Sequence, residues 1–414
     1  MTHILSGAAA GATVRQMAAR GSRYMEVAPV VGRIISDVRR QGDRALRKYA
    51  ERWDGVLPKM PLRVPPDEIE TAWKSACPEL KRSLRAAATN IRRFCEWQMP
   101  AEWTRTYKGI VAGQLVRPLD SVGCYVPGGR HPLVSTLLMT VIPAQVAGVP
   151  NIRVVSPQPR ADVLAAAGML GVRELYRVGG AQAIAALAYG TQSIARVDKI
   201  VGPGNLYVTA AKRLIAFDCE IDFLAGPTEA VIVSDAGTPE FIAADLVAQA
   251  EHDPEVLAVF ITTNDDLARR VSRAAEKLSR GNSVARQALQ RHGAILVSTS
   301  RCESFEWANE LAAEHITVDA ADVALVTNAG SIFVGDYSPQ ATGDYASGPN
   351  HVLPTGGGAR FRGGLSVLDF VKIVSIQRLS RTGLRRIAPA VEFLANAEGL
   401  QAHAQSVRAR FGHA

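Results

Sequence analysis

Residues 151–201 read NIRVVSPQPRADVLAAAGMLGVRELYRVGGAQAIAALAYGTQSIARVDKIV. Short runs rich in Val and Ile alternate here with segments rich in Ala and Leu, a pattern typical of buried strands that alternate with helices. It predicts strands at 151–156, 174–178 and 199–201 and helices at 161–170 and 181–189. Strands and helices that alternate in this way form a parallel sheet with helices on its faces.

The same alternation starts again after Ala225-Gly226-Pro227. It predicts strands at 230–234, 256–262 and 294–298 and helices at 239–251, 265–279 and 304–313. We therefore predict an α/β fold with two consecutive Rossmann-like parallel-sheet units, 121–225 and 226–369. Neither unit carries the GxGxxG sequence of the usual dinucleotide-binding turn.

Helical patterns flank these two units. In the N-terminal part, Val31, Ile34, Val38 and Leu46 recur at roughly helical spacing, and we expect residues 1–120 to form a helical layer that packs on the core. Residues 370–414 predict a helical C-terminal arm from two sets of apolar residues at helical spacing, which are Ile373, Ile376 and Leu379, then Ile387, Val391 and Leu394.

The composition is that of a soluble globular protein. No apolar run among the 414 residues could span a bilayer, and the N-terminus lacks a secretory signal, so we expect a cytoplasmic protein without a membrane partner. The five cysteines are widely spaced and include no CxxC pair, which argues against disulfides and thiolate metal sites. Cys124 is more typical of a small buried residue than of a nucleophile.

The formal net charge is +8. The basic residues of the chain are interleaved with acids or apolar residues at helical spacing, and no platform of aromatic residues for the stacking of bases lies among them. Solvated helix faces therefore explain the charge better than a nucleic-acid groove, and we expect no nucleic-acid partner. A nucleic-acid binder remains the alternative, with binding that collapses steeply as salt rises.

Two glycine-rich turns follow predicted strands. They are Gly179-Gly180-Ala181-Gln182 and Gly202-Pro203-Gly204-Asn205, and their backbone N–H groups could meet an anion or a ribose. Each alone is more typical of a tight turn between strand and helix. Two in consecutive units favour a ligand at the carboxyl edge of the sheet.

Metal-binding and proton-moving residue types gather in a few short stretches. Gln249 and His252 are spaced i and i+3 near the end of a predicted helix, and we expect Glu314 and His315 to be neighbours on a helix. Alone, His252 could complement a helix C-terminus, and the Glu-His pair could be a surface pair. The long loop 343–356 adds Asp344 and His351, while Glu398 and His403 lie on the terminal arm.

Four of these residues suggest one ion. Oxygen and imidazole ligands without thiolates favour Zn²⁺, with Mn²⁺ or Co²⁺ as substitutes. A terminal arm that carries Glu398 and His403 suggests that it reaches over another part of the protein or over a neighbouring subunit.

Together these stretches resemble the histidinol dehydrogenase family, in the family's order. The matching runs are Gly123–Gly129, Gly179–Ala188, Lys199–Asn205, Ala225–Glu229, Gln249–His252, Glu314-His315, Gly343–Thr355 and Glu398–His403, and the resemblance extends from Val38 to the end of the chain.

The resemblance implies a zinc-dependent and NAD-dependent enzyme that oxidises L-histidinol through L-histidinaldehyde to L-histidine in histidine biosynthesis. On this chain it implies the metal ligands Gln249, His252, Asp344 and His403, with His315 as the first base and Glu314 as the activator of water. It implies substrate contacts from Thr228, His351 and Glu398, and from His315 and the metal ligands. NAD contacts would come from Tyr125, Gln182 and Asn205 in the first unit.

The family forms intertwined homodimers in which the C-terminal arm completes the neighbour's site. This chain departs from the family pattern near the substrate residues: Thr228 stands where many members have Ser, and Ala313 where Pro is usual. Some relatives oxidise other polar alcohols, including a sulfonated propanediol, which is the alternative substrate class.

Overall fold

The computed structural model describes residues 3–21, 24–128 and 133–412, so that Gly129 of the Gly123–Gly129 motif lies outside the described residues. The fold is mixed α/β with two parallel sheets. The chain divides into two compact units, Met1–Gln98 with Leu119–Phe370, and Met99–Pro118 with Val371–Ala414.

The first unit contains a five-stranded sheet in the order β6-β5-β4-β7-β8, in which all neighbours are parallel. Its strands are β4 (Ser121–Tyr125), β5 (Asn151–Val155), β6 (Glu174–Tyr176), β7 (Lys199–Val201) and β8 (Glu220–Ile221). The three strands expected within residues 151–201 are confirmed, and so is their parallel pairing. Because the strand order reverses at β4, a crevice is expected at the carboxyl ends of the strands next to it.

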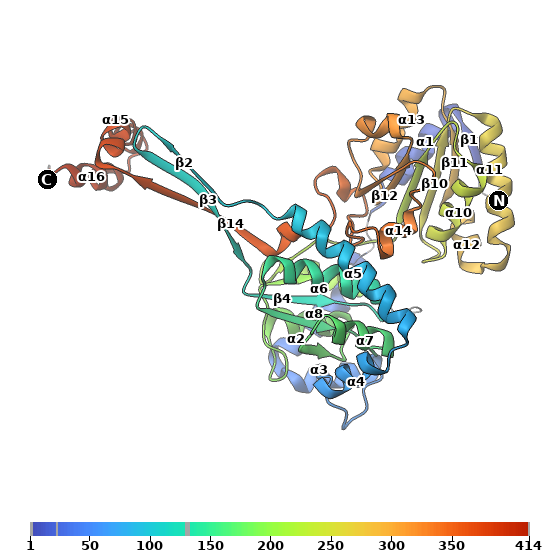
Figure 1. Ribbon diagram of the computed structural model, residues 1–414, viewed down its shortest axis with the longest axis horizontal. Helices are drawn as coiled ribbons and strands as arrows, with labels where there is room; N and C mark the ends of the chain where they lie inside the picture. Colours follow the sequence, from blue (N-terminus) through green and yellow to red (C-terminus); the bar gives the residue numbers. More distant parts are fainter. Residues whose placement is uncertain (1–2, 22–23, 129–132, 413–414) are drawn as a thin grey trace. The chain divides into compact units, whose positions relative to one another are not determined.

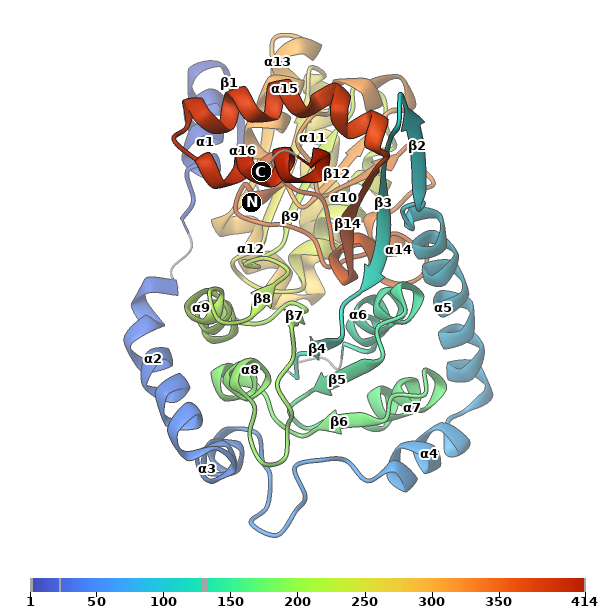
Figure 2. The ribbon, with the colours of Figure 1, turned by 90° about the vertical axis from the view of Figure 1, so that its left-hand side faces the viewer.

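Helices cover both faces of this sheet. Figure 2 shows α2, α3, α8 and α9 on one side and α4, α5, α6 and α7 on the other. They are α2 (Tyr24–Gln41), α3 (Asp43–Trp53), α4 (Pro66–Ser75), α5 (Pro78–Gln98), α6 (Val134–Ala147), α7 (Ala161–Met169), α8 (Gly180–Tyr189) and α9 (Leu206–Ile215). The helical spacing in the N-terminal part therefore predicted real helices.

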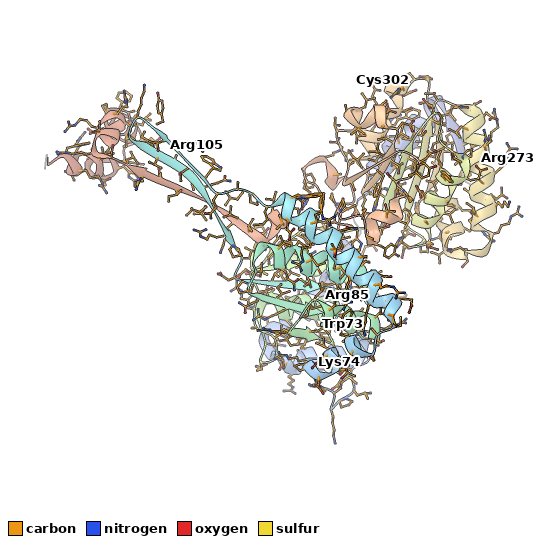
Figure 3. All side chains as sticks on the ribbon, viewed as in Figure 1. Trp73, Lys74, Arg85, Arg105, Arg273 and Cys302 are labelled. Carbon is orange, nitrogen blue, oxygen red and sulfur yellow. The ribbon has the colours of Figure 1, made fainter. Side chains whose placement is uncertain are left out.

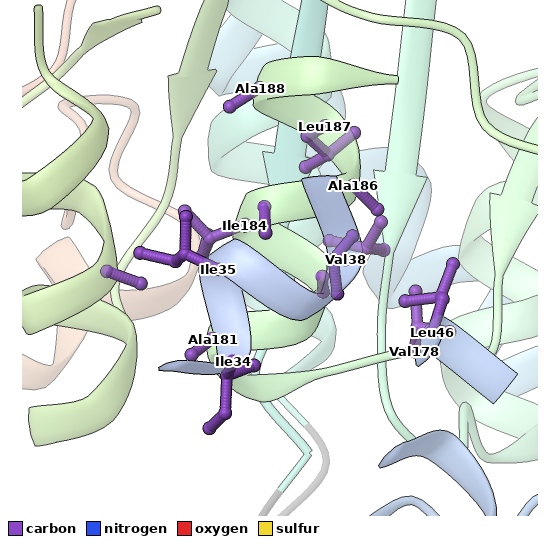
Figure 4. Packing of buried hydrophobic residues seen from close by; sticks show 14 of the residues in the cluster. Ile34, Ile35, Val38, Leu46, Val178, Ala181, Ile184, Ala186, Leu187 and Ala188 are labelled. Atoms are coloured by element: carbon purple, nitrogen blue, oxygen red, sulfur yellow. The ribbon is translucent and has the colours of Figure 1, made fainter. Parts of the chain in front are cut away.

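The contact between the N-terminal helices and α8 is apolar. Ile34, Ile35 and Val38 on one face of α2 pack against Ala181 and Ile184 of α8 (Figure 4). Small alanines on α8 let the helices approach closely, so the N-terminal helices are fixed to the sheet by burial of their apolar stripes.

A six-stranded parallel sheet, in the order β1-β11-β10-β9-β12-β13, forms the second half of this unit. Its strands are β1 (His3–Ser6), β9 (Glu229–Val233), β10 (Leu257–Thr262), β11 (Gly293–Val297), β12 (His315–Val318) and β13 (Ser331–Val334). One face packs on α1 (Gly7–Ala18) and α13 (Arg301–Leu311). The other packs on α10 (Pro239–Ala250), α11 (Asp265–Leu278) and α12 (Ser283–Arg291) (Figure 1). The short helix α14 (Gln340–Tyr345) follows β13.

The second unit is a three-stranded antiparallel sheet with helices at one end. Its strands, in the order β14-β3-β2, are β2 (Trp103–Tyr107), β3 (Ile110–Pro118) and β14 (Val371–Leu379). The helices are α15 (Arg381–Ala397) and α16 (Gln401–Arg408). Gly383 of α15 lies against Gly109 of the turn between β2 and β3, so closely that a Cβ on either residue would clash.

Two expectations about the flanks are wrong. The N-terminal 120 residues are not only helical, because β1 joins the six-stranded sheet beside β11, and β2 and β3 form the antiparallel sheet. The arm begins with strand β14, whose residues pair with β3 along its whole length. The spacing of Ile373, Ile376 and Leu379 suggested a helix because a strand with apolar residues on both faces can show the same spacing.

The basic residues lie largely on exposed helix and strand faces. Arg105 on β2 and Arg273 on α11 are exposed (Figure 3). Trp73 of α4 is flanked by two cations of α5, with Arg85 at 5.3 Å and Lys81 at 5.4 Å from the ring centroid. This indole already has cation partners within the fold. No helix of the described residues is both long and apolar enough to cross a membrane.

A buried ion pair fixes the turn between β7 and α9. The ammonium of Lys212 in α9 contacts the Asp222 carboxylate and also donates to the Gly202 carbonyl at 3.0 Å. The other oxygen of Asp222 accepts the Gly202 N–H at 2.7 Å. The two side chains are 3% and 0% exposed, so each buried charge depends on the other for neutralisation.

Replacing Lys212 by Met should therefore lower the free energy of unfolding by about 3–5 kcal/mol, because the Asp222 charge is left buried and unpaired. The matched control is Lys74→Met, which removes an exposed pair with Glu70 and should cost less than about 1 kcal/mol. Denaturant unfolding of both variants measures the difference. Equal, small losses would show that the buried pair contributes no more than the exposed one.

Candidate active site and dinucleotide cavity

Glu314 and His315 lie at the amino edge of the six-stranded sheet. His315 is the first residue of β12 and pairs in register with Ala230, the second residue of β9. The expectation of a helix for this pair is wrong, because Glu314 directly precedes a strand and His315 begins it. In a parallel sheet the strand starts share one edge, so the pair lies beside Thr228 and Glu229 at the start of β9.

The two side chains are buried and close together. Glu314 is 7% exposed and His315 is 2% exposed, and Nδ1 of His315 lies 3.8 Å from Oε2 of Glu314. The same Oε2 accepts the backbone N–H of Glu229 at 3.2 Å. Both ring nitrogens of His315 are buried and neither makes a hydrogen bond within the described residues, so the imidazole lacks the partner that a buried ring ordinarily has.

Asp344 joins this pair to α10. Its Oδ1 lies 3.5 Å from Nε2 of His315, and its Oδ2 accepts the side-chain amide of Gln249 at 3.2 Å. Asp344 is in the last turn of α14, not in an irregular loop as its glycine- and proline-rich context suggested. Gln249 is in the last turn of α10 and is 1% exposed.

His351 is fixed by two hydrogen bonds. Its Nδ1 lies 2.7 Å from the Asp344 carbonyl oxygen, which can only accept, so Nδ1 carries the proton. Its Nε2 then accepts from the Thr136 hydroxyl of α6 at 3.3 Å. The loop residue and the apolar helix α6 thus meet through a polar contact.

The pKa shifts follow from burial and mutual attraction. Burial raises the pKa of Glu314 to about 7, and His315 opposes this rise. Burial alone would lower the pKa of His315, but the Glu314 and Asp344 carboxylates outweigh it and raise the pKa. Burial would raise the pKa of Asp344, yet His315, His351 and His252 together lower it. Burial lowers the pKa of His351, which keeps that ring neutral.

The donor set partly fits a metal ion. The side-chain amide of Gln249 donates to Asp344, and the side-chain carbonyl oxygen of Gln249 makes no hydrogen bond within the described residues. His252, two residues beyond α10, is exposed but close enough to lower the pKa of Asp344. The C-terminus of α10 adds partial negative charge, which favours a cation. Within residues 3–21, 24–128 and 133–412, no three His, Cys, Asp or Glu side chains form a metal site by themselves.

A cavity of about 550 Å³ opens at the carboxyl edge of the five-stranded sheet. It gathers the three residues expected to contact a dinucleotide, Tyr125, Gln182 and Asn205. Its apolar wall includes Val30 and Ile34 of α2. The volume is in the range of small-molecule sites, and the place is the one predicted by the reversal of strand order at β4.

The three polar residues are held by the glycine-rich turns. The Tyr125 hydroxyl accepts the N–H of Gly180 at 3.0 Å, and burial raises the pKa of Tyr125 to about 12. The side-chain oxygen Oδ1 of Asn205 caps α9, accepting from Tyr207 N at 3.0 Å and Val208 N at 3.2 Å, which leaves its side-chain N–H groups for a ligand. Gln182 donates to Asp54 Oδ2 at 3.0 Å.

The remaining predicted residues are not all brought together. Thr228 is half-buried directly before β9. Glu398, at the end of α15, and His403, in α16, are exposed and belong to the second unit. Cys124 is fully buried in β4, and burial raises its pKa to about 12, in agreement with a structural role.

Sequence reasoning assigned no role to three residues of these sites. Glu229 is 4% exposed; its Oε1 accepts the Gly356 N–H at 3.0 Å and pairs with Arg20 at 3.1 Å. Thr136 lies within the apolar helix α6, where a fully buried hydroxyl is the signal of a polar partner. Asp54 directly follows α3 and lines the cavity.

Comparisons with known proteins identify the family of this chain. A family model described as histidinol dehydrogenase matches residues 17–411. The chain belongs to the histidinol dehydrogenase family. It is accordingly an oxidoreductase, as the resemblance implied.

Relatives cover nearly the whole chain. A histidinol dehydrogenase of Methanothermobacter thermautotrophicus is 48% identical over 396 residues, which is 92% of each chain. One of Methanosarcina barkeri is 45% identical over 419 residues, 97% of this chain and 96% of the relative. The crystal structure of histidinol dehydrogenase from Elizabethkingia anophelis, 33% identical, matches with a TM-score of 0.94 over 99% of this chain and 98% of that one.

Proposed function

We propose that this chain is a zinc- and NAD-dependent histidinol dehydrogenase that oxidises L-histidinol through L-histidinaldehyde to L-histidine, the end of histidine biosynthesis. The observation that carries the proposal is the largely buried cluster in which Glu314, His315 and Asp344 meet Gln249 and His351. These residues come from segments far apart in the sequence and include a base, an acid with a raised pKa and ligand oxygens. A cytoplasmic location stays a prediction.

The residues of the cluster divide the chemistry. His315, whose ring nitrogens have no hydrogen bond within the described residues, takes the proton of the alcohol. NAD bound in the cavity beside Tyr125 would accept the hydride. Oε2 of Glu314 accepts a hydrogen bond from the Glu229 N–H. The other carboxylate oxygen of Glu314 therefore takes the proton from the water that adds to the aldehyde. A second hydride transfer then gives the carboxylate.

The substrate and metal contacts follow from the same cluster. Zinc would be held by Gln249, His252, Asp344 and a second chain's copy of His403, and it would bind and orient the substrate's imidazole and amino nitrogens. Thr228 and His351 line the approach from this chain, and Glu398 would come with the neighbour's arm. Orientation of the carbinol carbon beside the dinucleotide is then the main contribution of this shell.

A steady-state assay that follows NADH tests the function. L-Histidinol should be oxidised with two NADH per histidine formed, and a sulfonated propanediol should be a poor substrate. The opposite preference would assign the chain to the family's relatives that act on other polar alcohols, for which Thr228 and Ala313 are the residues to examine.

The proposed ligand set makes a prediction about metal content. His252→Ala and His403→Ala should each bind zinc at least about tenfold more weakly, because each removes one donor from a four-ligand shell. The control is His292→Ala, since His292 pairs with Glu255 on the surface, 3.4 Å away. Elemental analysis after dialysis measures the content. Full zinc in both ligand variants would exclude these residues from the shell.

The raised pKa of Glu314 makes a prediction about the second oxidation. A base must be ionised to accept a proton, so oxidation of histidinaldehyde should fall as pH drops below about 7. In Glu314→Gln, the rate of histidinaldehyde oxidation should fall about 100-fold or more and should no longer decrease as the pH drops, while oxidation of the alcohol continues. His315→Asn should impair both steps.

Single-turnover assays with histidinol and with histidinaldehyde separate the two steps. The control is Glu310→Gln on the exposed face of α13, which should leave both unchanged. If Glu314→Gln slows both oxidations equally, the division of labour between Glu314 and His315 is wrong.

We also propose that two chains share each site. In the second unit, neighbouring residues Ile373 and Val374 of β14 are 54% and 44% exposed, although their side chains lie on opposite faces of the strand. A three-stranded sheet with both faces uncovered lacks the burial that an isolated sheet requires. A symmetric homodimer would cover these faces and bring His403 to a neighbour's Gln249 and Asp344.

Mixing two inactive variants tests the sharing. His403→Ala and His252→Ala chains that exchange freely should recover about a quarter of wild-type activity, because half of the dimers are mixed and each has one intact site. Native mass spectrometry verifies the exchange. No recovery after verified exchange would mean that His403 serves its own chain.

A further inference from the structure

The dinucleotide cavity has an acidic residue supplied from outside the sheet. Asp54 directly follows α3 in the N-terminal layer, is 5% exposed and lines the cavity. Its Oδ2 accepts the N–H of Gly179 and the side-chain amide of Gln182, each at 3.0 Å. Its Oδ1 makes no hydrogen bond within the described residues. An acceptor oxygen is thus available at the cavity wall.

This carboxylate changes what the start of α8 can bind. A helix N-terminus after a glycine-rich turn ordinarily offers free N–H groups to a phosphate. Here Gly179 N–H is bound to Asp54 and Gly180 N–H to the Tyr125 hydroxyl. A phosphate placed there would find these donors occupied and a fixed negative charge beside them. A hydroxyl group, in contrast, could donate to Oδ1.

The cavity also has a cationic side. Arg160 precedes α7 and lines the same cavity, and its guanidinium makes no hydrogen bond or ion pair with the described residues. The charged diphosphate of a dinucleotide therefore has a better partner at Arg160 than at the start of α8. The two residues give the cavity one end for phosphate and another for neutral hydroxyls.

The strand order indicates which ribose meets Asp54. Thr209 of α9 donates to the Ala225 carbonyl at 2.8 Å, in the segment that leads to Thr228 and the catalytic cluster. The nicotinamide end of the cofactor must lie toward that side, next to β7. Asp54 binds the turn after β6, which is the opposite edge strand of the sheet. The adenosine half therefore faces Asp54.

We propose that Asp54 determines the choice between NAD and NADP: its free oxygen accepts a hydrogen bond from the adenosine ribose hydroxyl and repels a phosphate at the 2′ position. The inference rests on the proposed NAD-linked function. It assigns to an N-terminal residue, after α3, the discrimination that usual dinucleotide-binding folds obtain from an acid near the second strand.

The test compares Asp54→Asn with Asp43→Asn. The side-chain oxygen of an asparagine can still accept the hydrogen bond from the Gly179 N–H. Asp54→Asn therefore removes the negative charge and preserves the hydrogen bond at the start of α8. Asp43, the first residue of α3, binds the Ser193 N–H at 3.2 Å and does not line the cavity, so the second variant removes the same charge elsewhere. Dissociation constants of NADH and NADPH are measured by fluorescence without substrate, and those of ADP-ribose and its 2′-phosphate by calorimetry.

Wild type and Asp43→Asn should bind the ligands without a 2′-phosphate more tightly than those with one. In Asp54→Asn, the ratio of the two dissociation constants should decrease by about tenfold or more. If the ratio of the two dissociation constants does not change, or if both ligands bind more weakly by the same factor, Asp54 serves only as a cap for α8. Thermal melting checks the fold, and Asp54→Ser replaces the variant if the amide does not fold. A wild type that binds neither dinucleotide would remove the proposed function itself, whereas an unchanged ratio removes this inference alone.

Discussion

The direction of the strands in the two parallel sheets decides where each kind of ligand can bind. In a parallel sheet with crossover helices, strand ends share one edge with helix N-termini, and strand starts share the other edge with helix C-termini. The cavity lies at the first kind of edge, after β4 and β7, and the Glu314-His315 pair lies at the second, before β12. Only the first place follows the usual rule for ligands of such sheets.

The amino edge of the six-stranded sheet suits a cation and a proton-transfer pair. The C-terminus of α10 delivers Gln249 there, and α14 delivers Asp344 in its last turn. Asp344 is the centre of this arrangement, because its carboxylate contacts Gln249 and His315 and its carbonyl oxygen holds His351. Gln249 and His315 are buried and Asp344 and His351 are partly buried, and their partners come from different segments, so the cluster depends on all its segments together.

In the second unit, backbone pairing is extensive but apolar burial is small. Its three strands pair along their full length, yet apolar residues such as Ile373 and Ile376 remain exposed. Backbone hydrogen bonds define the sheet, but they do not bury enough apolar surface to stabilise it alone. A unit of this kind is complete only when another surface covers it, which is the physical basis for proposing a dimer.

Much of the fold followed from the sequence because local burial leaves a local pattern. Strands such as β5 and β10 are buried on both faces, so their Val- and Ile-rich runs were recognisable. The helices expected at 161–170, 181–189, 239–251, 265–279 and 304–313 were found to within a few residues, whereas α6 and α12 were not predicted. The motifs also indicated which residues carry the chemistry. Where a pattern was ambiguous, as at Ile373 to Leu379, spacing alone gave the wrong element.

The sequence by itself determined the alternation of strands and helices, the family and the residue types of the site. Only the tertiary structure decided that His315 begins a strand, that β1 pairs with the distant strand β11, and that Asp54 reaches the turn at Gly179. Periodicity reports the burial of neighbours along the chain. Contacts between distant segments depend on how the sheets bring their edges together, and no local pattern encodes that.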